Sequence, residues 1–297
     1  MSAGNNKKFH LAGIIPVAGQ PSGFNFPWHE SCNPIAPDFL AIERAAAECA
    51  YAGCETIWVV CNDDIQPLVR HRLGDYINDP VWVSRPQDPK ASETRKEIPI
   101  FYVPIHPNDR DKRDCLSWSV LYGASTAYNI SLRISKWATP DRYYVSFPYC
   151  VYPVNFLRDH RAQISSENKF YLSYDGETVR DGKYLGFTFD EEEFIAIRSN
   201  LRKQATGLYS STLTSGMPRE TLPLDERYSA RFFTLSQVFS LLNVDKSDMI
   251  EVPFYFDIDS WESYCLYLSS EERTQIKRPP KVIMDYREFD LIGEDKT

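Results

Sequence analysis

Continuous apolar runs alternate with stretches in which apolar residues recur at helical spacing. Four stretches contain runs with the length of a strand that is buried on both faces: 9–19, 56–61, 98–105 and 142–153. Three stretches between them have the apolar spacing of helices: 39–53, 63–77 and 114–131. Strand and helix therefore alternate over the first half of the chain, which predicts a doubly wound α/β fold with a parallel core.

Polar residues and a glycine mark the ends of the first two predicted helices. Asp38 is suited to cap the first helix, and Gly53 is suited to end it. Asp63 and Asp64 would open the second helix, because carboxylates are favoured at the positive end of the helix dipole.

The second half of the chain has a different texture. Short strand patterns follow at 169–179 and 184–190, and a loop rich in Ser, Thr, Gly and Pro follows at 207–226. A strand-to-helix element at 230–243 precedes a strand, an acidic turn and a helix at 250–272. We expect a flexible tail at 1–9, one domain at 10–268 with its core at 10–165 and its elaborated half at 166–268, and a polar extension at 269–297.

Composition and charge narrow the class of protein. The formal net charge of −8 provides no general basic field for nucleic acid, although a local basic groove stays open as an alternative. The seven cysteines are irregularly spaced without a CxxC motif, which favours reduced thiols in the cytoplasm. No apolar run has the length of a membrane helix, and the first nine residues do not have the pattern of a signal peptide.

Four stretches carry a resemblance to a known family. They are IIPVAGQPSGF at 14–24, PIAPDFLAIERAAAECAYAGCETIWVVC at 34–61, CLSWSVLYGAS at 115–125 and VPFYFDIDSWESYCLYL at 252–268. In order and content they resemble the nucleotidyltransferase-like fold of sugar-nucleotide pyrophosphorylases, which belongs with the GT-A glycosyltransferases. The resemblance implies a three-layer α/β/α domain with a mostly parallel central sheet and a smaller β-rich elaboration. In general character, but in no motif, the chain is also similar to proteins of tailed phages of marine bacteria.

The chain departs from the family at three charged positions. The glycine loop has no arginine for phosphate, and Asn33 stands near the place of the lysine that the family puts on the α-phosphate. The strand at 142–153 has no carboxylate, although the family ends this strand with an aspartate for Mg²⁺. Because phosphoryl transfer depends on metal ions and cations, these departures argue against ordinary pyrophosphorylase chemistry.

Two late carboxylates are the catalytic candidates. The resemblance places Asp257 and Asp259 in the family's acidic turn, where Asp257 would act as a base or as a ligand of Mg²⁺ or Mn²⁺. The alternative is helix capping by Asp259 or Ser260 before the helix that begins at Trp261. Asp257 is therefore the preferred catalytic residue and metal ligand.

The nucleotide-binding candidates come from three segments. The backbone of Ala18, Gly19 and Gly23 could approach a nucleotide, with Asn33 beside it, or this segment could be an ordinary turn after a core strand. A further group of cations could bind phosphate or could belong to a solvated loop of mixed charge: Arg110, Lys112 and Arg113.

Trp28 and His29 are the candidates for contact with substrate. They lie in the loop between the first strand and the first helix, and they could stack on a base or sugar and donate a hydrogen bond to it. The alternative is an aromatic cover over the core.

The sequence thus favours a divergent transferase that binds a nucleotide or nucleotide sugar, of nucleotidyltransferase or glycosyltransferase type. The alternative is a binding or structural protein that keeps the fold and has lost the chemistry. Nucleic acid is an open but less favoured partner, and no membrane partner is expected.

Overall fold

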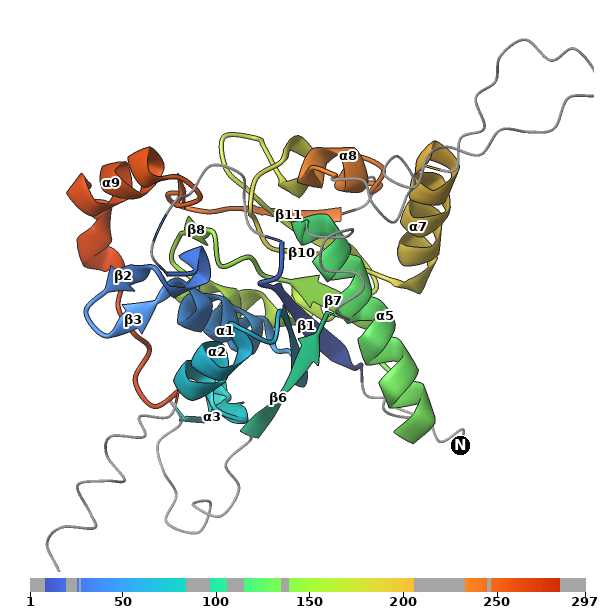
Figure 1. The fold of residues 1–297 in the computed structure, drawn as a ribbon, viewed down its shortest axis with the longest axis horizontal. Helices are drawn as coiled ribbons and strands as arrows, with labels where there is room; N and C mark the ends of the chain where they lie inside the picture. The colour runs from blue at the N-terminus through green and yellow to red at the C-terminus, as the bar shows by residue number, and fades with distance from the viewer. Residues whose placement is uncertain are drawn as a thin grey trace, which may run out of the picture.

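A single eight-stranded sheet forms the centre of the computed structural model, which describes residues 9–19, 26, 28–83, 97–105, 115–134, 139–205, 233–244 and 247–283 (Figure 1). The strand order is β11-β9-β10-β7-β1-β4-β6-β5. The strands are β1 (Leu11–Pro16), β4 (Thr56–Cys61), β5 (Tyr76–Asn78), β6 (Glu97–Pro104), β7 (Arg142–Val145), β9 (Lys169–Ser173), β10 (Phe187–Phe189) and β11 (Ser247–Glu251).

Parallel pairing dominates the sheet. The pairs β7–β1, β1–β4, β4–β6 and β9–β11 are parallel, whereas β10 runs antiparallel to both of its neighbours and β5 runs antiparallel to β6. All residues of β1 are buried, because this central strand pairs on both sides and is covered on both faces. The prediction of a mostly parallel central sheet is confirmed.

Helices cover both faces of the sheet. One face carries α1 (Ala41–Ala52), α2 (Gln66–Leu73), α3 (Pro80–Val83), the 3₁₀ turn η3 (Asn155–His160) and α6 (Arg161–Ile164). The other face carries α5 (Leu116–Ile134), α7 (Glu191–Ala205) and α8 (Leu235–Phe239). Two buried apolar clusters, one under each set of helices, complete the predicted three-layer α/β/α architecture.

The first helix ends as predicted but begins differently. Gly53 has the left-handed backbone that ends α1, with φ of 94°. Asp38 is not the N-cap, because α1 begins after Leu40, whose amide donates to the Glu43 carboxylate at 2.8 Å. The Asp38 carboxylate instead forms ion pairs with Arg72 and Arg278.

The apolar run at 142–153 is not one strand. It forms β7 and then, after a turn through Pro148 and Tyr149, the short strand β8 (Cys150–Val151). β8 leaves the central sheet and pairs antiparallel with β12 (Phe256–Asp257). The break redirects the chain at the carboxyl end of β7.

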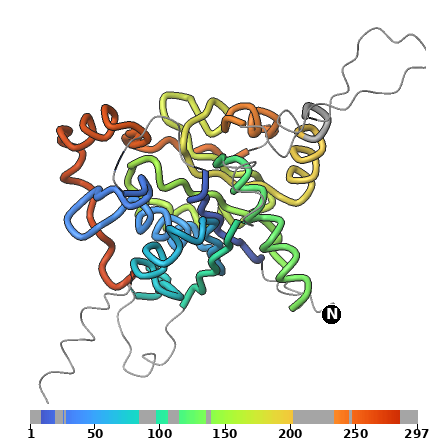
Figure 2. Tube along the Cα trace, viewed as in Figure 1, coloured from blue at the N-terminus to red at the C-terminus, as the bar shows by residue number. Residues whose placement is uncertain are grey.

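The second half extends the same sheet, because β10 pairs with β7, β9 pairs with β10 and β11 pairs with β9 (these segments run from yellow to orange in Figure 2). The sequence prediction missed α7 and placed residues 76–77 of β5 in a helix. The remaining elements are η1 (Glu30–Cys32), β2 (Pro34–Ala36), β3 (Phe39–Leu40), η4 (Val179–Asp181), α9 (Trp261–Ser269) and η5 (Glu272–Gln275).

The start of the predicted polar extension contributes to the core. Val282 and Ile283 are buried, and the Asn78 side chain donates to the Lys281 carbonyl oxygen at 2.9 Å. The predicted loop at 207–226 lies outside the described residues. In the described ranges no helix has the length and apolar content needed to cross a membrane. All seven cysteines are free thiols, as predicted.

Candidate functional site

The sheet has a topological switch point between β1 and β7. The chain leaves β1 for β4 on one side, whereas it leaves β7 for β9 and β10 on the other side. In open α/β sheets, ligands bind outside the carboxyl ends of the strands at such a point. The residues that follow β1 and β7 therefore define the candidate functional site.

Ala18 and Gly19 lie at this switch point and are held by the fold. The amides of Val17 and Ala18 donate to the Val60 carbonyl oxygen at 2.8 and 2.9 Å, and Ser119 Oγ donates to the Ala18 carbonyl oxygen at 2.6 Å. Gly19 has a φ of +87°, and a Cβ there would lie 2.7 Å from the Cys115 nitrogen. The Ala18 amide is thus engaged by the sheet, and Gly19 is required by close backbone packing.

His29 and Asn33 are brought to the same strand end by η1. The Ser31 amide donates to His29 Nδ1 at 3.3 Å, and the His29 ring also hydrogen-bonds the Val17 backbone. Asn33 is fully buried, and its Nδ2 has no hydrogen-bond partner in the described part of the chain. The segment therefore brings a neutral imidazole to the carboxyl edge of β1 and keeps the Asn33 amide buried.

Burial lowers the pKa of His29 to about 4, although the nearby Asp64 charge opposes this shift. The folded protein therefore resists protonation that the unfolded chain accepts near pH 6.5. We expect stability to fall as pH falls from about 6.5 to about 4, because in this window the unfolded chain binds more protons. Urea midpoints of wild type and His29→Gln measure the effect, and His71→Gln is the exposed control. An unchanged pH slope in His29→Gln would contradict it.

Trp28 belongs to a group of aromatic rings beside the site. The Phe26 ring centroid lies 4.6 Å from that of Trp28 and 4.9 Å from that of Trp261 in α9. Trp28 is 44% exposed and Trp261 is 58% exposed, while the Trp28 indole donates to Asn33 Oδ1 at 3.0 Å. Two partly exposed indoles thus lie beside the same Phe26 ring, and rings of this kind can stack on a flat base or a sugar ring.

Asp257 and Asp259 are each held by a tyrosine. Tyr255 donates to Asp257 Oδ1, and Tyr184 donates to Asp259 Oδ2 at 3.0 Å. The Tyr184 amide in turn donates to the Tyr255 hydroxyl oxygen at 3.0 Å, which joins the two pairs. Ser260 is the N-cap of α9, accepting from the Ser263 amide, so Asp259 is not used for capping.

Asp257 has the character of a base. Burial raises its pKa, while the Tyr255 hydrogen bond and the Lys183 ammonium, 3.7 Å from Oδ2, lower it. Its side chain is still 32% exposed. A carboxylate with a raised pKa that solvent can reach is suited to accept a proton.

The surroundings of Asp257 do not fit a metal ion well. A divalent cation at Oδ2 would face the Lys183 ammonium, and Oδ1 is occupied by Tyr255. Among the described residues, no three His, Cys, Asp or Glu side chains form a possible metal site. The prediction of Mg²⁺ or Mn²⁺ therefore stays a prediction, and no chemical step below depends on it.

The main feature that the sequence analysis missed is a buried ion pair under β7. Glu48 in α1 is completely buried and accepts from four side chains: Arg44 at 2.9 Å, Tyr144 at 2.8 Å, Ser146 at 2.5 Å and Tyr152 at 2.6 Å. Ser146 directly follows β7, so the Glu48 carboxylate is bound by a residue at the carboxyl end of this strand. The carboxylate oxygens are taken up by these donors.

Arg44 connects this pair to the candidate site. Its Nη2 donates to the Phe147 carbonyl oxygen at 2.5 Å and lies 3.5 Å from Cys150 Sγ. The Cys150 thiol donates to the Tyr184 carbonyl oxygen at 2.8 Å, and burial raises its pKa. Cys150 is therefore a protonated structural thiol. Only the spacing of Arg44 and Glu48, four apart on one helix, could have signalled the pair.

Four of the sequence candidates, Gly23, Arg110, Lys112 and Arg113, lie outside the described residues. The others fall into two sets that both lie near the switch point. Ala18, Gly19, Trp28, His29 and Asn33 follow β1, whereas Asp257 and Asp259 are carried by β12 and the turn after it. β12 reaches the site through its pairing with β8, the continuation of β7.

Comparisons with solved structures show the same fold. A putative glucose-1-phosphate thymidylyltransferase from Bacillus anthracis is 11% identical, with a TM-score of 0.52 over 86% of this chain and 93% of that chain. UTP-bound UGPase from Acinetobacter baumannii is 13% identical, with a TM-score of 0.51 over 98% and 100%. A UDP-glucose pyrophosphorylase complexed with UDP-glucose is 10% identical, with a TM-score of 0.50 over 88% and 97%.

At the level of sequence, no protein-family model and no curated protein matches the chain. The structural likeness, at 10–13% identity, establishes the fold alone. The chain therefore has the fold of the nucleotidyltransferases that make sugar nucleotides.

Proposed function

We propose that the protein binds a nucleotide or nucleotide sugar at the β1–β7 switch point and transfers part of it to an acceptor. The observation that carries this proposal is the Asp257 carboxylate beside the switch point. It accepts a hydrogen bond from Tyr255, it is partly exposed, and burial raises its pKa. Two of the solved structures with this fold hold UTP and UDP-glucose, which makes uridine nucleotides the first to test.

The proposed chemistry needs one proton acceptor. The proton of an acceptor hydroxyl would pass to Asp257 as the hydroxyl oxygen bonds to the transferred sugar or nucleotidyl group. The bond from that group to its leaving phosphate oxygen breaks, and the nucleoside diphosphate or pyrophosphate departs with the electron pair. Trp28 would stack on the bound ring.

One observation favours the second candidate, a protein that binds a ligand without chemistry. The carboxylate that reaches the end of β7 belongs to Glu48, and four hydrogen bonds hold it inside the fold. If this place cannot serve catalysis, the fold would act in binding or assembly.

Thermal unfolding with added ligand tests binding. A ligand that binds only the folded protein adds about 2.7 kcal/mol at one hundred times its Kd. We expect UTP or UDP-glucose to raise the Tm in a titration run with Mg²⁺, with Mn²⁺ and with EDTA. If no nucleotide changes the Tm under any of these conditions, the proposed site is wrong.

A variant of Asp257 separates catalysis from binding. UDP release from UDP-glucose, or pyrophosphate release from UTP with a hydroxyl acceptor such as glucose, should fall at least about 100-fold in Asp257→Asn. The nucleotide-induced rise in Tm should persist, and Asp159→Asn, at an exposed carboxylate of η3, should retain full activity. Binding with no turnover in wild type would favour the binding protein, and full turnover in Asp257→Asn would remove Asp257 from the mechanism.

A further inference from the structure

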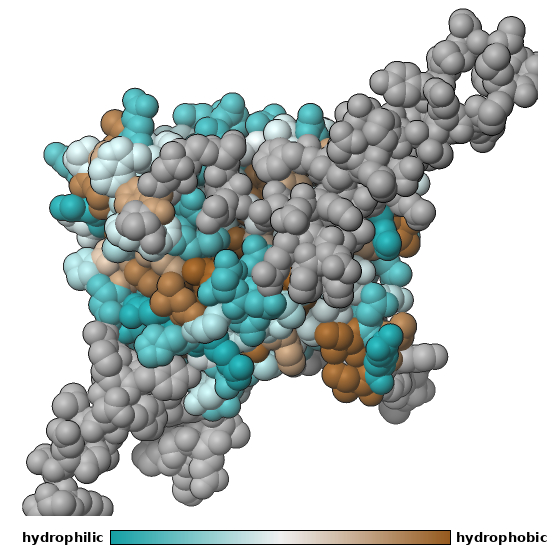
Figure 3. Space-filling view, in the orientation of Figure 1, coloured by the Kyte–Doolittle hydropathy of each residue, from teal (hydrophilic) through white to brown (hydrophobic). Residues whose placement is uncertain are grey.

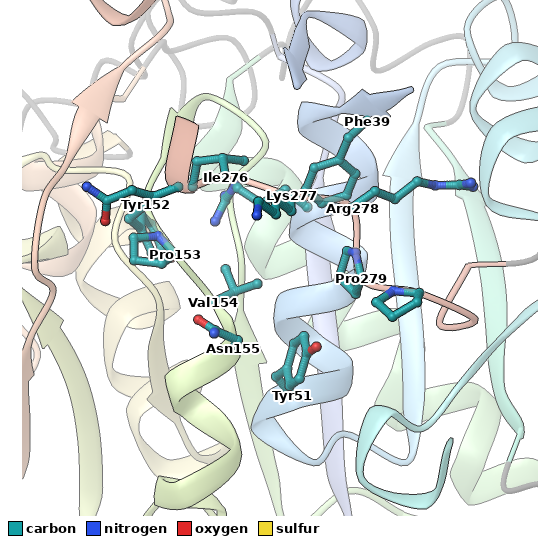
Figure 4. Close-up of a pocket in the computed structure, with 13 residues that line it drawn as sticks. Phe39, Tyr51, Tyr152, Pro153, Val154, Asn155, Ile276, Lys277, Arg278 and Pro279 are labelled. Atoms are coloured by element: carbon teal, nitrogen blue, oxygen red, sulfur yellow. The ribbon is translucent and has the colours of Figure 1, made fainter. Parts of the chain in front are cut away.

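A cavity lies beside α1. It has a volume of about 230 Å³ and lies between α1, the segment 152–155 and the segment 275–280 (Figure 4). In Figure 4, Tyr51 and Asn155 lie on one side of the cavity, and Ile276, Lys277 and Pro279 lie on the other. Nothing in the proposed function uses this cavity.

The charges around the cavity are of one sign. Three of the lining residues are cationic, and none of the described residues that line it is acidic, although the chain carries a net charge of −8. Arg44 pairs with Glu48, and Arg278 extends away from the cavity to pair with Asp38 (Figure 4). Lys277 is exposed and makes no ion pair with the described residues, so its ammonium is available to a ligand.

The walls offer both apolar contact and polar groups. Phe39, Tyr152 and three prolines supply flat apolar surface, whereas Asn155 and Gln275 supply amide groups. Arg44, which also lines the cavity, is buried, and its Nε has no hydrogen-bond partner among the residues that the structure describes. A ligand with a negative head and an apolar body matches this combination.

The segment that covers the cavity is anchored at several places. Arg278 contacts the Asp38 carboxylate at 3.2 Å and the Glu43 carboxylate at 3.6 Å. After Arg278, the backbone amide of Asn78 donates to the Val282 carbonyl oxygen at 2.8 Å. Before Arg278, the Ile276 side chain is buried in the core. The cavity is therefore preformed, which reduces the entropy lost when a ligand binds.

The volume limits the size of the ligand. An apolar cavity of about 150 Å³ in another protein binds benzene, so a cavity half as large again has room for one ring and a charged group. We propose that this cavity binds a small organic anion in which a single ring carries a phosphate or a carboxylate. Lys277 would pair with the anionic head, and the ring would lie against Tyr51, Val154 and Pro279.

Ligand-observed NMR with a set of probes tests the proposal. We expect phenyl phosphate or benzoate to bind with a Kd on the order of 1 mM. The comparison of these two probes identifies the preferred head group. Phenol, which lacks the charge, and inorganic phosphate, which lacks the ring, should each bind about tenfold more weakly. Equal binding of inorganic phosphate and phenyl phosphate would overturn the proposal, as would no binding of either aromatic anion at about 20 mM.

Three variants locate the binding. Lys277→Gln should raise the Kd of the aromatic anion about five- to tenfold, because a charge-assisted contact is lost. Lys281→Gln removes the same charge at an exposed residue outside the cavity and should leave the Kd unchanged. Asn155→Trp, at an exposed position, should fill the cavity and abolish binding without lowering the Tm. Unchanged binding in both Lys277→Gln and Asn155→Trp would refute this site.

The outcome is independent of the proposed function. The probes lack a nucleoside, and the nucleotide-induced rise in Tm should be the same in wild type and in Asn155→Trp. A failure of the anion probes therefore leaves nucleotide binding standing, and a failure of nucleotide binding leaves this cavity to be judged by its own variants.

Discussion

Replacing Glu48 by glutamine is expected to lower the free energy of unfolding by about 3–5 kcal/mol, because it removes one partner of a buried ion pair. Arg44, only 1% exposed, would keep its charge without a counter-ion. An amide also accepts fewer hydrogen bonds than a carboxylate, so the hydroxyls of Tyr144 and Tyr152 would compete for it. In a chain of this size the loss corresponds to a fall in Tm of roughly 10 °C.

Thermal or urea unfolding measures this effect against two references. Glu192→Gln removes an exposed carboxylate from the first turn of α7 and should cost under about 1 kcal/mol. The double variant with Arg44→Met should be less destabilised than the sum of the two single variants, because it leaves no buried charge unpaired. A Glu48→Gln protein within about 1 kcal/mol of wild type would show that the pair does not bear on stability.

Gly19→Ala is the second substitution with a large expected effect. The φ of +87° costs an alanine about 1–2 kcal/mol. Its Cβ would also lie 2.6 Å from Cys115 Cα and 2.7 Å from Cys115 N, and backbone atoms cannot rotate away as a side-chain end can. We expect a total cost of about 3 kcal/mol or more, with displacement of the strand-end loop from α5.

Gly176 provides the matched control for Gly19. It has a similar φ of +78°, but a Cβ there would meet nothing within 4 Å. Gly176→Ala should therefore show the conformational cost alone, about 1–2 kcal/mol. The difference between the two unfolding free energies measures the close packing at the switch point, and an equal loss in both variants would show that packing against Cys115 costs nothing.

Much of the fold followed from local pattern. The apolar run at 56–61 and the helical spacing at 39–53 are confirmed as β4 and α1. In both segments the apolar positions in the sequence are the positions that become buried in the fold. The boundary at Asp38 failed for a reason outside the local sequence. The carboxylate is engaged by Arg72 and by Arg278, which is 240 residues away, so tertiary ion pairs replaced the expected cap.

The continuous apolar run at 142–153 misled for a related reason. Its residues are all buried or nearly so, both within β7 and after the chain leaves the sheet. Apolar content alone therefore cannot show where pairing with β1 ends and pairing with β12 begins. The missed helix α7 begins with three glutamates, which favour the start of a helix, but it lies between a predicted strand and a predicted loop and was assigned to neither.

The candidate site was harder to predict than the fold. Asp257 and Asp259 follow from resemblance, but their tyrosine partners depend on distant contacts: Tyr184 lies 75 residues before Asp259. Glu48 carries no site signature in sequence, because its partners Tyr144 and Tyr152 lie 96 and 104 residues later. Burial and hydrogen bonding of this kind are properties of the assembled sheet.

The same separation bears on how the chain acquires its structure during synthesis. A nascent chain that ends before β7 already contains β1, α1 and β4, but it lacks the three hydroxyl groups that hold the Glu48 carboxylate. Burying Arg44 and Glu48 at that stage would leave most of their hydrogen bonds unmade. The inner face of α1 can therefore be desolvated favourably only after β7 has emerged and inserted beside β1. Packing of α1 onto the sheet is thus completed late, after residues 142–152 have been synthesised.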